Sequence, residues 1–560
     1  MAYIIADNII SPLGDTSAAN YQAVKSGRSA LRGYSGAPFE GCEPFTSALL
    51  DRDQRERITL PGLSYFESKA VASARKAMSS VDMTGGSTRL ILSSTKGDSA
   101  LLGSSSGAMG QTAARIASAL GVTTQPVVVS NACISGLAAI ILGARMIDAN
   151  QCDYAIIIGC DDISRFVVSG FQSLKAMSPE RCRPFDLERN GLNLGEAAAT
   201  VILSREPVAR SDWRVAGGVV RNDAYHLTSP SRAADGQFGC LTQLLSGTSA
   251  DDIGFINLHG TATFFNDQME SVALRRAALG NVPANALKGY FGHTLGAAGV
   301  LETIISMKAA DDGTVPATAG FERLGVSGNV NLSAQNRATS KQVVVKMLSG
   351  FGGCNAAALL DKKRLSAPRV ENATLSPTHH VTISPTAATI DNKPVDCPAQ
   401  GKDLLTALYK AHVGDYPKFY KMDGLSRLGF IATELLLNAE NQERFTTRSD
   451  RAVILFNLTS SIEADQEYIA SIADPDNYFP SPSLFIYTLP NIVTGEIAIR
   501  NRWNGETSLF ILPSHDNSQE RAIIEASCLD PATRSVVAGW IDYTDSHNFE
   551  ADLHIYQVKH

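Results

Sequence analysis

The chain has 560 residues, of which 44% are hydrophobic and 19% charged, and its formal net charge is −7. This composition is typical of a folded protein with several structural units and excludes a disordered or fibrous chain. The net negative charge argues against a general nucleic-acid binder, which would carry a basic face.

The sequence predicts a cytoplasmic protein without a membrane span. No apolar run reaches the eighteen or so residues that a transmembrane helix needs, and residues 1–15 lack the basic and apolar segments of a secretion signal. The nine cysteines are scattered and form no CxxC pair. We therefore expect neither a disulfide framework nor a zinc site.

In the first part of the chain, apolar runs alternate with segments of helix length. Strands are expected over 89–97, 125–132 and 154–162, and helices over 105–121 and 135–150. Similar apolar runs return at 256–260, 301–310 and 341–350. The alternation predicts a layered α/β protein whose sheet is largely parallel.

Cys133 stands where the apolar strand 125–132 gives way to a helix. Backbone N–H groups at a helix start carry partial positive charge, which favours a thiolate over a thiol. The small residues Ser135 and Gly136 would let an acyl chain or the backbone approach closely. The alternative is a buried structural cysteine, the commoner fate of this residue type.

Two histidines, His259 and His293, stand in turns near the ends of expected strands. Lys288 opens the Gly-rich turn that contains His293, and Phe351 lies in a second Gly-rich turn after the run 341–350. A cysteine combined with such histidines indicates nucleophilic catalysis. A metal site is a weaker interpretation, because neither histidine has a second ligand three or four residues away.

Residues 363–390 are rich in Pro, Thr and Ser and indicate a linker into a new unit. The tail that follows repeats three segments of the first part in the same order: 419–438 is similar to 60–78, 450–461 to 87–98, and 489–516 to 104–133. The alternative is an α/β tail with a coincidental pattern. Where the first copy has Cys133, the second has Asp516 or Asn517, so the second copy is expected to lack a nucleophile.

Six motifs occur in a family-specific order: NACISG at 131–136, RPFDLERNGLNLGEAAA at 183–199, NDAYHLTSP at 222–230, HGTAT at 259–263 with Asp267, KGYFGHTLGAAG at 288–299 and GFGGCNAA at 350–357. On these motifs, residues 1–365 resemble the elongating β-ketoacyl-acyl-carrier-protein synthases of the thiolase superfamily, which are acyltransferases. The resemblance implies a five-layered αβαβα fold with an N-terminal half over 1–208 and a C-terminal half over 209–365. A linker over 366–380 and a degenerate, non-catalytic half-domain over 381–560, resembling an N-terminal synthase half, would follow.

The resemblance implies a decarboxylative Claisen condensation in the synthesis of fatty acids, polyenes or polyketides. Cys133 would take the acyl chain from a phosphopantetheine thiol, with the N–H groups of Cys133 and Phe351 forming the oxyanion hole. His259 and His293 would bind the malonyl thioester and stabilise its enolate. Lys288 would organise this site through Glu302. No cofactor of the enzyme's own is implied, because phosphopantetheine arrives on the acyl carrier protein.

The same resemblance assigns substrate contacts. Thr261, Thr263 and Thr228 match pantetheine-binding positions, and Phe171 matches an aromatic gate beside the acyl pocket, as does Phe351. Lys175 matches a basic position that faces the acidic carrier protein, although a solvated surface lysine is the alternative. The expected assembly is a homodimer or a heterodimer with a related synthase.

Two other functions stay open. Cys354 could serve as the second cysteine of a thiolase-like condensing enzyme, although HGTAT and KGYFGHTLGAAG belong to decarboxylating synthases. A non-catalytic partner subunit would have lost the nucleophile, which this chain retains. For the tail we expect a role in packing, assembly or partner choice rather than in chemistry, with its polar residues His515, Asp516 and His547 at the surface.

Overall fold

The computed structural model describes residues 1–36, 39–104, 108–209, 212–362, 373–474 and 478–560. In this part of the chain most strands fall into three groups of five that share one strand order. None of the described helices is both long and apolar enough to cross a bilayer.

The first group runs in the order β5 (Val127–Val129), β4 (Thr88–Ser93), β6 (Tyr154–Asp161), β8 (Ala197–Ser204) and β1 (Ala2–Ile10). Strand β4 is parallel to β5 and β6, whereas β8 is antiparallel to β6 and β1. The central strands β4, β6 and β8 are mostly apolar and are buried over most of their length, as expected for a sheet that is covered by helices on both faces.

The second group repeats this pattern with β11 (Ala284–Asn285), β10 (Phe255–Asn257), β14 (Val343–Ser349), β15 (Cys354–Asp361) and β9 (Trp213–Asn222). Strand β10 is parallel to β11 and β14, and β15 is antiparallel to β14 and β9. One end of β9 also pairs with β1, which connects the first two groups.

Helices form the other layers of this part of the fold. The buried helices α5 (Ser135–Asp148) and α10 (Ala298–Asp311) contact strands of both groups and lie between them. Helix α3 (Tyr65–Met78), whose start is fixed by a reciprocal capping box of Ser64 and Glu67, covers the outer face of the first group. Helices α7 (Asp235–Leu244) and α8 (Phe264–Arg276) lie outside the second group. These layers confirm the predicted αβαβα fold.

The predicted elements agree with the observed ones near their centres. Strands β4, β5 and β6 lie within or close to 89–97, 125–132 and 154–162, and α5 ends two residues before the expected 150. The helix expected over 105–121 is α4 (Met109–Ala119), and its first positions, 105–107, lie outside the described residues.

The third group belongs to the tail and runs in the order β20 (Thr507–Ile511), β19 (Arg451–Asn457), β21 (Ser535–Asp545), β22 (Asn548–Lys559) and β16 (Thr374–Ser384). Strand β19 is parallel to both neighbours, and β22 is antiparallel to β21 and β16. The tail also contains α12 (Gly424–Glu440), α13 (Ile462–Ala473), α14 (Pro482–Tyr487), α15 (Ile492–Asn501) and α16 (Asn517–Ser527).

The tail therefore repeats the order of the first group. Helix α12 corresponds to α3, β19 to β4, α15 to α4 and β20 to β5, which are the segments matched from the sequence. One boundary is wrong: the linker expected over 366–380 includes the first seven residues of β16, which begins at Thr374. The Pro and Thr content of this segment suggested a linker, but the strand pairs with β22 along its length. Residues 366–372 of the expected linker lie outside the described part.

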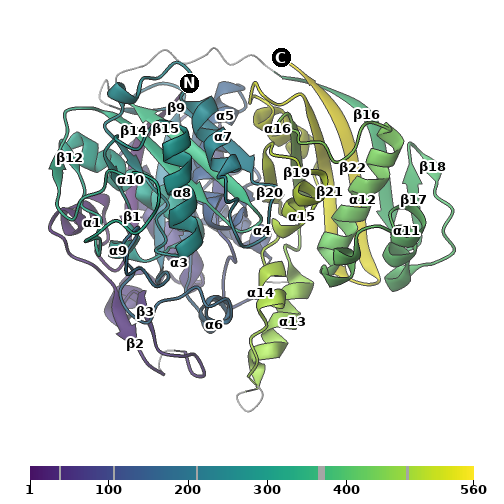
Figure 1. The fold of residues 1–560 in the computed structure, drawn as a ribbon, viewed down its shortest axis with the longest axis horizontal. Helices are drawn as coiled ribbons and strands as arrows, with labels where there is room; N and C mark the ends of the chain where they lie inside the picture. The colour runs from purple at the N-terminus through teal and green to yellow at the C-terminus, as the bar shows by residue number, and fades with distance from the viewer. Residues whose placement is uncertain (37–38, 105–107, 210–211, 363–372, 475–477) are drawn as a thin grey trace.

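The first and third groups join edge to edge. Strand β20 pairs antiparallel with β5, with Phe510 opposite Val129 and Ile511 opposite Val128. In Figure 1 the tail accordingly lies beside the first part of the chain, with β20 and α15 at the junction and α13 and α14 extending away from the sheet toward α6 (Arg165–Ser173).

The remaining elements are short or peripheral: α1 (Ser17–Lys25), α2 (Arg52–Ile58), α9 (Lys288–Phe291), α11 (Leu404–His412), β2 (Arg32–Tyr34), β3 (Phe45–Ala48), β7 (Leu194–Gly195), β12 (Thr314–Val315), β13 (Arg337–Ala338), β17 (Ala387–Ile390) and β18 (Lys393–Pro394).

Candidate active site

Cys133 lies in a single helical turn between β5 and α5. The preceding residue, Ala132, has a φ of 47°, a left-handed conformation that is strained for a residue with a side chain. The Ser135 hydroxyl stabilises the turn, because it donates to the Ala132 carbonyl at 2.6 Å and accepts from the Asn131 N–H at 2.8 Å. The sharp turn presents the thiol to a cavity at the end of the strand.

The cavity has a volume of about 380 Å³ and gathers most of the residues expected to act on the substrate. It is lined by Cys133, Phe171, Lys175, Thr228, His259, Thr261, Thr263, His293 and Phe351. Lys288 and Glu302 lie behind the histidines rather than on the cavity wall. All eleven predicted site residues therefore belong to one region, although they come from segments more than 200 residues apart.

His259 follows β10, and His293 follows α9. Their rings meet edge to face with centroids 5.2 Å apart. One ring nitrogen of each lies within 4.8 Å of the other and of the Cys133 sulfur. His293 Nδ1 accepts the Leu295 N–H at 3.2 Å, so in the neutral ring Nε2 carries the proton. That Nε2 is buried without a hydrogen-bond partner among the described residues and can donate to a substrate.

Two buried lysines and one glutamate lie behind the histidines. Lys288 Nζ donates to the His259 carbonyl at 2.6 Å and to Glu302 Oε1 at 2.8 Å, while Lys346 Nζ donates to Glu302 Oε2 at 2.7 Å. Burial, reinforced by the positive charge of Lys288, holds the pKa of both His259 and His293 well below the usual value. The two imidazoles are therefore neutral near pH 7.

Lys346 was missed by the sequence analysis. The sequence does contain an indication of its role, because a lysine in the apolar run VVVKMLS of β14 needs a buried counter-charge. Burial lowers the pKa of Lys346 to about 8 despite the attraction of Glu302.

Two carboxylates of α8 hold the HGTAT turn in place. Glu270 accepts the N–H groups of His259 at 2.7 Å and Gly260 at 2.8 Å. Asp267, one turn earlier, accepts the Thr261 N–H at 3.1 Å. Glu270 also escaped the sequence analysis, although its spacing of three residues from Asp267 places both on one helix face.

The thiol of Cys133 lies at the backbone N–H groups of Cys133 and Phe351, which favour its ionised form. Burial has the larger effect and raises the pKa of Cys133 to about 12, against these N–H groups and Lys288. The helix start therefore does not by itself produce a thiolate. The Phe351 ring stacks on Phe171 with centroids 6.1 Å apart, beside the same sulfur.

The predicted pantetheine and carrier contacts lie toward the mouth of the cavity. The hydroxyls of Thr261 and Thr263 are 2.8 Å apart, and the Thr228 N–H donates to His226 Nδ1 at 3.2 Å. Lys175 follows α6 in a left-handed conformation, with φ 51°.

The inner end of the site is closed by the tail. A second space of about 20 Å³ beside Cys133 is lined by Val167, Phe171, Leu295 and Phe351 and, from the tail, by Phe485 and Leu489. The Phe485 ring lies 5.6 Å from that of Phe171. A side chain at Gly170 would collide with the Phe485 ring, which its Cβ would approach to 2.1 Å. No pattern in the sequence indicates that the tail contacts this inner space.

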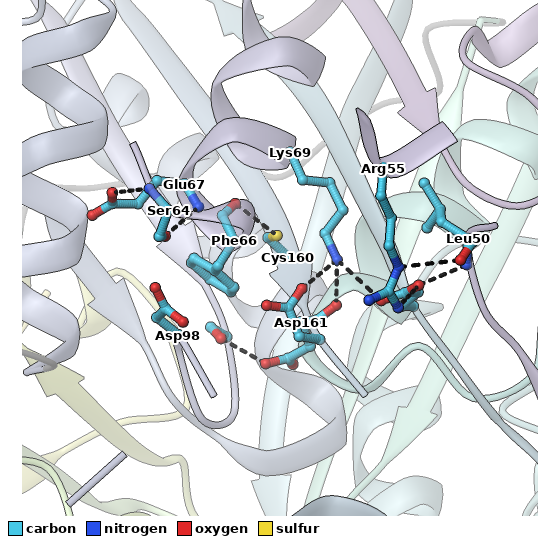
Figure 2. A network of polar contacts seen from close by, with 12 residues as sticks. Leu50, Arg55, Ser64, Phe66, Glu67, Lys69, Asp98, Cys160 and Asp161 are labelled. Carbon is cyan, nitrogen blue, oxygen red and sulfur yellow. Dashed lines mark hydrogen bonds and ion pairs between the residues drawn. The ribbon is translucent and has the colours of Figure 1, made fainter. Parts of the chain in front are cut away.

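A buried polar network supports this site from the end of β6 (Figure 2). Asp161 accepts the Ser94 hydroxyl at 2.6 Å and the Gly296 N–H at 2.7 Å, so it ties the turn after His293 to the turn after β4. Lys69 donates to the Asp161 carbonyl at 2.9 Å and pairs with Asp162. Because these buried charges are paired and hydrogen-bonded, the network can hold the His293 turn rigidly.

The polar residues of the tail form no comparable pocket in the described part. Asp516 caps α16, accepting the N–H groups of Ser518 and Gln519, and His515 pairs with Glu520 at 3.2 Å. The backbone N–H of His547 donates to Asp545 in the turn between β21 and β22.

A cross-strand cluster of His380, Asp552 and His554 lies on β16 and β22, with His380 Nε2 2.8 Å from Asp552 Oδ1. The two imidazole rings are stacked 4.1 Å apart and 11° from parallel. Ring-nitrogen lone pairs lie in the ring planes, so parallel rings do not point at a common ion. The arrangement fits a cross-strand ion pair.

Comparisons with known proteins match two segments of the chain. Residues 78–209 match the N-terminal domain of β-ketoacyl synthases, and residues 214–322 match the C-terminal domain. The chain is 32% identical over 252 residues to 3-oxoacyl-[acyl-carrier-protein] synthase 2 of Rhizobium meliloti (strain 1021), covering 41% of this chain and 59% of that protein. It is 33% identical over 258 residues to the tetracenomycin polyketide synthase ketoacyl synthase alpha subunit of Streptomyces glaucescens, covering 42% and 60%. The chain thus spans about three fifths of the curated relatives it matches.

Among solved structures, the ketosynthase ApeO in complex with its chain length factor ApeC, from Xenorhabdus doucetiae, superposes with a TM-score of 0.57 at 28% identity, covering 64% of this chain and 97% of that one. The PfaC keto synthase–chain length factor superposes with a TM-score of 0.76 at 14% identity, covering 100% of this chain and 78% of that one. The fold of the tail therefore has a counterpart in a solved structure as well. Residues 78–209 and 214–322 are thus similar to the two domains of the β-ketoacyl synthases.

Proposed function

We propose that the chain catalyses decarboxylative Claisen condensation between an acyl group on Cys133 and a malonyl thioester. One observation carries this proposal: a nucleophilic thiol, two neutral histidines and two backbone N–H donors converge in one cavity. Such an arrangement can stabilise negative charge at two positions, which condensation by this route requires.

In the first step the Cys133 sulfur attacks an acyl thioester. A carbon–sulfur bond forms to Cys133, the carrier thiol leaves, and the proton of Cys133 passes to the departing sulfur. The N–H groups of Cys133 and Phe351 stabilise the oxyanion of the tetrahedral intermediate. The inner pocket closed by Phe485 receives the acyl chain.

In the second step the malonyl thioester loses carbon dioxide. The electron pair of the broken carbon–carbon bond becomes an enolate, whose oxygen accepts hydrogen bonds from His259 and His293. The enolate carbon attacks the acyl carbonyl on Cys133, and the cysteine sulfur leaves as a β-ketoacyl thioester is released. Lys288 and Lys346 add positive charge behind the enolate site, and Lys288 also fixes the His259 backbone.

We propose an acyl carrier protein as the donor of both thioesters, in fatty acid, polyene or polyketide synthesis. Its phosphopantetheine would enter past Thr261 and Thr263, and Lys175 at the mouth would attract the acidic carrier. No further cofactor takes part. The reaction would take place in the cytoplasm, where the nine free cysteines stay reduced.

The geometry favours this function over a thiolase. Cys354 does not line the cavity, and its sulfur donates to the carbonyl groups of Phe351 at 3.2 Å and Asn131 at 3.5 Å. Burial raises the pKa of Cys354 well above its usual value, so it is poorly placed to serve as a base. A non-catalytic subunit is disfavoured by the complete cysteine–histidine–histidine site.

The test is intact-mass detection of an acyl adduct after incubation with a panel of acyl-carrier thioesters, together with release of carbon dioxide from malonyl carrier protein. The proposal expects an adduct on the wild type, none on Cys133→Ala, and condensation only when a malonyl thioester is supplied. Turnover without a malonyl thioester would show a thiolase instead, and labelling that persists in Cys133→Ala would move the nucleophile elsewhere.

A further inference from the structure

The loop that carries the Phe351 N–H donor is contacted by the tail. Asn491, at the N-terminus of α15, donates from Nδ2 to the Phe351 carbonyl at 2.9 Å. Asn491 is only 1% exposed. A residue of the half without a nucleophile therefore binds the backbone of an oxyanion-hole residue.

The two segments fit together closely. Gly352 has a φ of +86°, and a Cβ at this position would come within 2.7 Å of Asn491 Nδ2. One turn further along α15, a Cβ at Gly495 would come within 2.7 Å of the Gly352 carbonyl oxygen. The loop leaves no room between itself and the first turn of α15, so the position of α15 determines the position of the loop.

The hydrogen bond is not explained by stability alone. Asn491 Oδ1 is buried without a hydrogen-bond partner among the described residues. A buried unsatisfied amide oxygen costs about 1–3 kcal/mol, so an apolar side chain would suit a purely structural position better. What the amide provides that an apolar residue cannot is a donor to the Phe351 carbonyl.

The other side of the oxyanion hole is also tied to the tail. Asn131, two residues before Cys133, accepts the Leu509 N–H of β20 at 2.8 Å. The Ser130 N–H donates to the Leu509 carbonyl at 3.2 Å. Both loops that supply an N–H donor are thus hydrogen-bonded to the tail, one to the start of α15 and the other to β20.

The two copies of the repeat differ at the residue that precedes the helix, which is Asn491 in the tail. Helix α4, the counterpart of α15, is preceded by Ala108, whose side chain has no hydrogen-bond donor. Helix α4 packs against the tail, where a Cβ at Gly110 would meet the Leu512 carbonyl oxygen at 2.6 Å. The asparagine thus occurs in the copy whose helix faces the Phe351 loop.

We infer that Asn491 is a positioning residue for the oxyanion hole, through which the tail sets the orientation of the Phe351 N–H toward the Cys133 thioester. The inference rests on the proposed function. It predicts that the tail affects acyl transfer to Cys133, which uses the oxyanion hole, but not malonyl decarboxylation, which uses the histidines.

The experiment compares full-length wild type with Asn491→Ala, the isosteric Asn491→Asp, and Asn501→Ala as a control. Asn501 is also buried, lies at the other end of α15 and donates to the Ile497 carbonyl. Three rates are measured for each: acylation of Cys133 by an acyl-carrier thioester, decarboxylation of malonyl carrier protein, and alkylation of Cys133 by iodoacetamide, which needs no oxyanion hole.

Both Asn491 variants are expected to slow acylation about ten- to hundredfold, somewhat less than the loss of a complete oxyanion donor. Decarboxylation should stay at the wild-type rate. Alkylation should slow far less than acylation, because the Phe351 N–H is only one of several groups that favour the Cys133 thiolate. Asn501→Ala should match the wild type in all three rates. Equal loss of all three rates in the Asn491 variants, or unchanged acylation, would overturn the inference. A wild type that forms no acyl adduct would instead overturn the proposed function.

Discussion

At the residue scale, the thiol of Cys133 is subject to opposing influences. Burial disfavours its negative charge, while two N–H groups and Lys288 favour it, and the balance raises its pKa to about 12. A raised pKa means that the thiol is protonated at rest and that the thiolate fraction grows as pH rises. The neutral histidines do not form a permanent ion pair with it, because their pKa values are lowered.

We therefore expect the rate of Cys133 alkylation by iodoacetamide to rise about tenfold per pH unit between pH 7 and 9. The measurement is peptide mapping by mass spectrometry at each pH, with Cys133→Ala identifying the peptide. A rate that already levels off below pH 8 would indicate a stable thiolate and contradict this account of the site.

Glu302 is the shared partner of two buried lysines, so its loss and the loss of one lysine have unequal consequences. Glu302→Gln leaves Lys288 and Lys346 buried without a counter-charge, which should destabilise the fold by about 3–5 kcal/mol. Lys346→Met leaves the Lys288–Glu302 pair intact and should lower the thermal unfolding temperature far less. An equal loss of thermal stability in the two variants would mean that other groups compensate the charges of the two lysines.

At the element scale, the inner wall of the acyl pocket depends on α14, a helix of six residues in the tail. Phe485 of α14 packs against Phe166, Phe171 and Tyr468. The rings of Phe485 and Phe171 line the inner space. The free space at this end is about 20 Å³. Under the proposed function, an aromatic ring from the tail would therefore limit the length of the acyl chain.

Phe485→Ala should therefore load longer acyl chains on Cys133 than the wild type does, at a stability cost of about 3–5 kcal/mol for a buried phenylalanine. The chain-length distribution of the adducts is read by intact mass. Phe479→Ala is the control, because Phe479 precedes the same helix but is 74% exposed. An unchanged distribution in Phe485→Ala would place the acyl chain elsewhere.

The elements themselves were largely predictable from sequence, because β-branched runs and helix-length segments alternate clearly in the first part of the chain. The catalytic residues were predictable because their motifs are local. Phe485 and Asn491 were not, since each meets the site across the β5–β20 junction, and neither SPSLFIY nor its neighbours carries a pattern that reveals such a contact. Lys346 could have been found as a charged residue in an apolar strand. Glu270 could have been found as an acidic residue one helical turn after Asp267.

At the scale of the whole molecule, buried ion pairs fix the tail to the catalytic part. Arg145 of α5 pairs with Glu506 at 2.7 Å, and Arg221 of β9 pairs with Asp530 at 2.7 Å. Although burial alone would raise the pKa of Asp530, Arg221 and Arg145 hold it at about 2. The tail fixed in this way also contacts the site, through Asn491 beside Phe351 and Phe485 beside Phe171.

Asp530→Asn should loosen the tail, lowering the thermal unfolding temperature and exposing the tail to limited proteolysis, whereas the exposed control Asp396→Asn should change neither. A depressed pKa stabilises the fold above the unfolded-state value of about 4. The stability difference between wild type and Asp530→Asn should thus be largest at pH 5 and above, and it should decrease as pH falls toward 2. A stability difference that increases as pH falls would contradict a stabilising role for ionised Asp530.

The pairing of β5 with β20 joins two strands of one polypeptide. Two separate subunits that met along such an edge would dissociate on dilution, because their association depends on concentration. A covalent tether replaces that dependence with an effective concentration fixed by the linking segment. The Phe351 loop therefore keeps its contact with Asn491 however dilute the protein is, and both sides of the site are always synthesised in a one-to-one ratio.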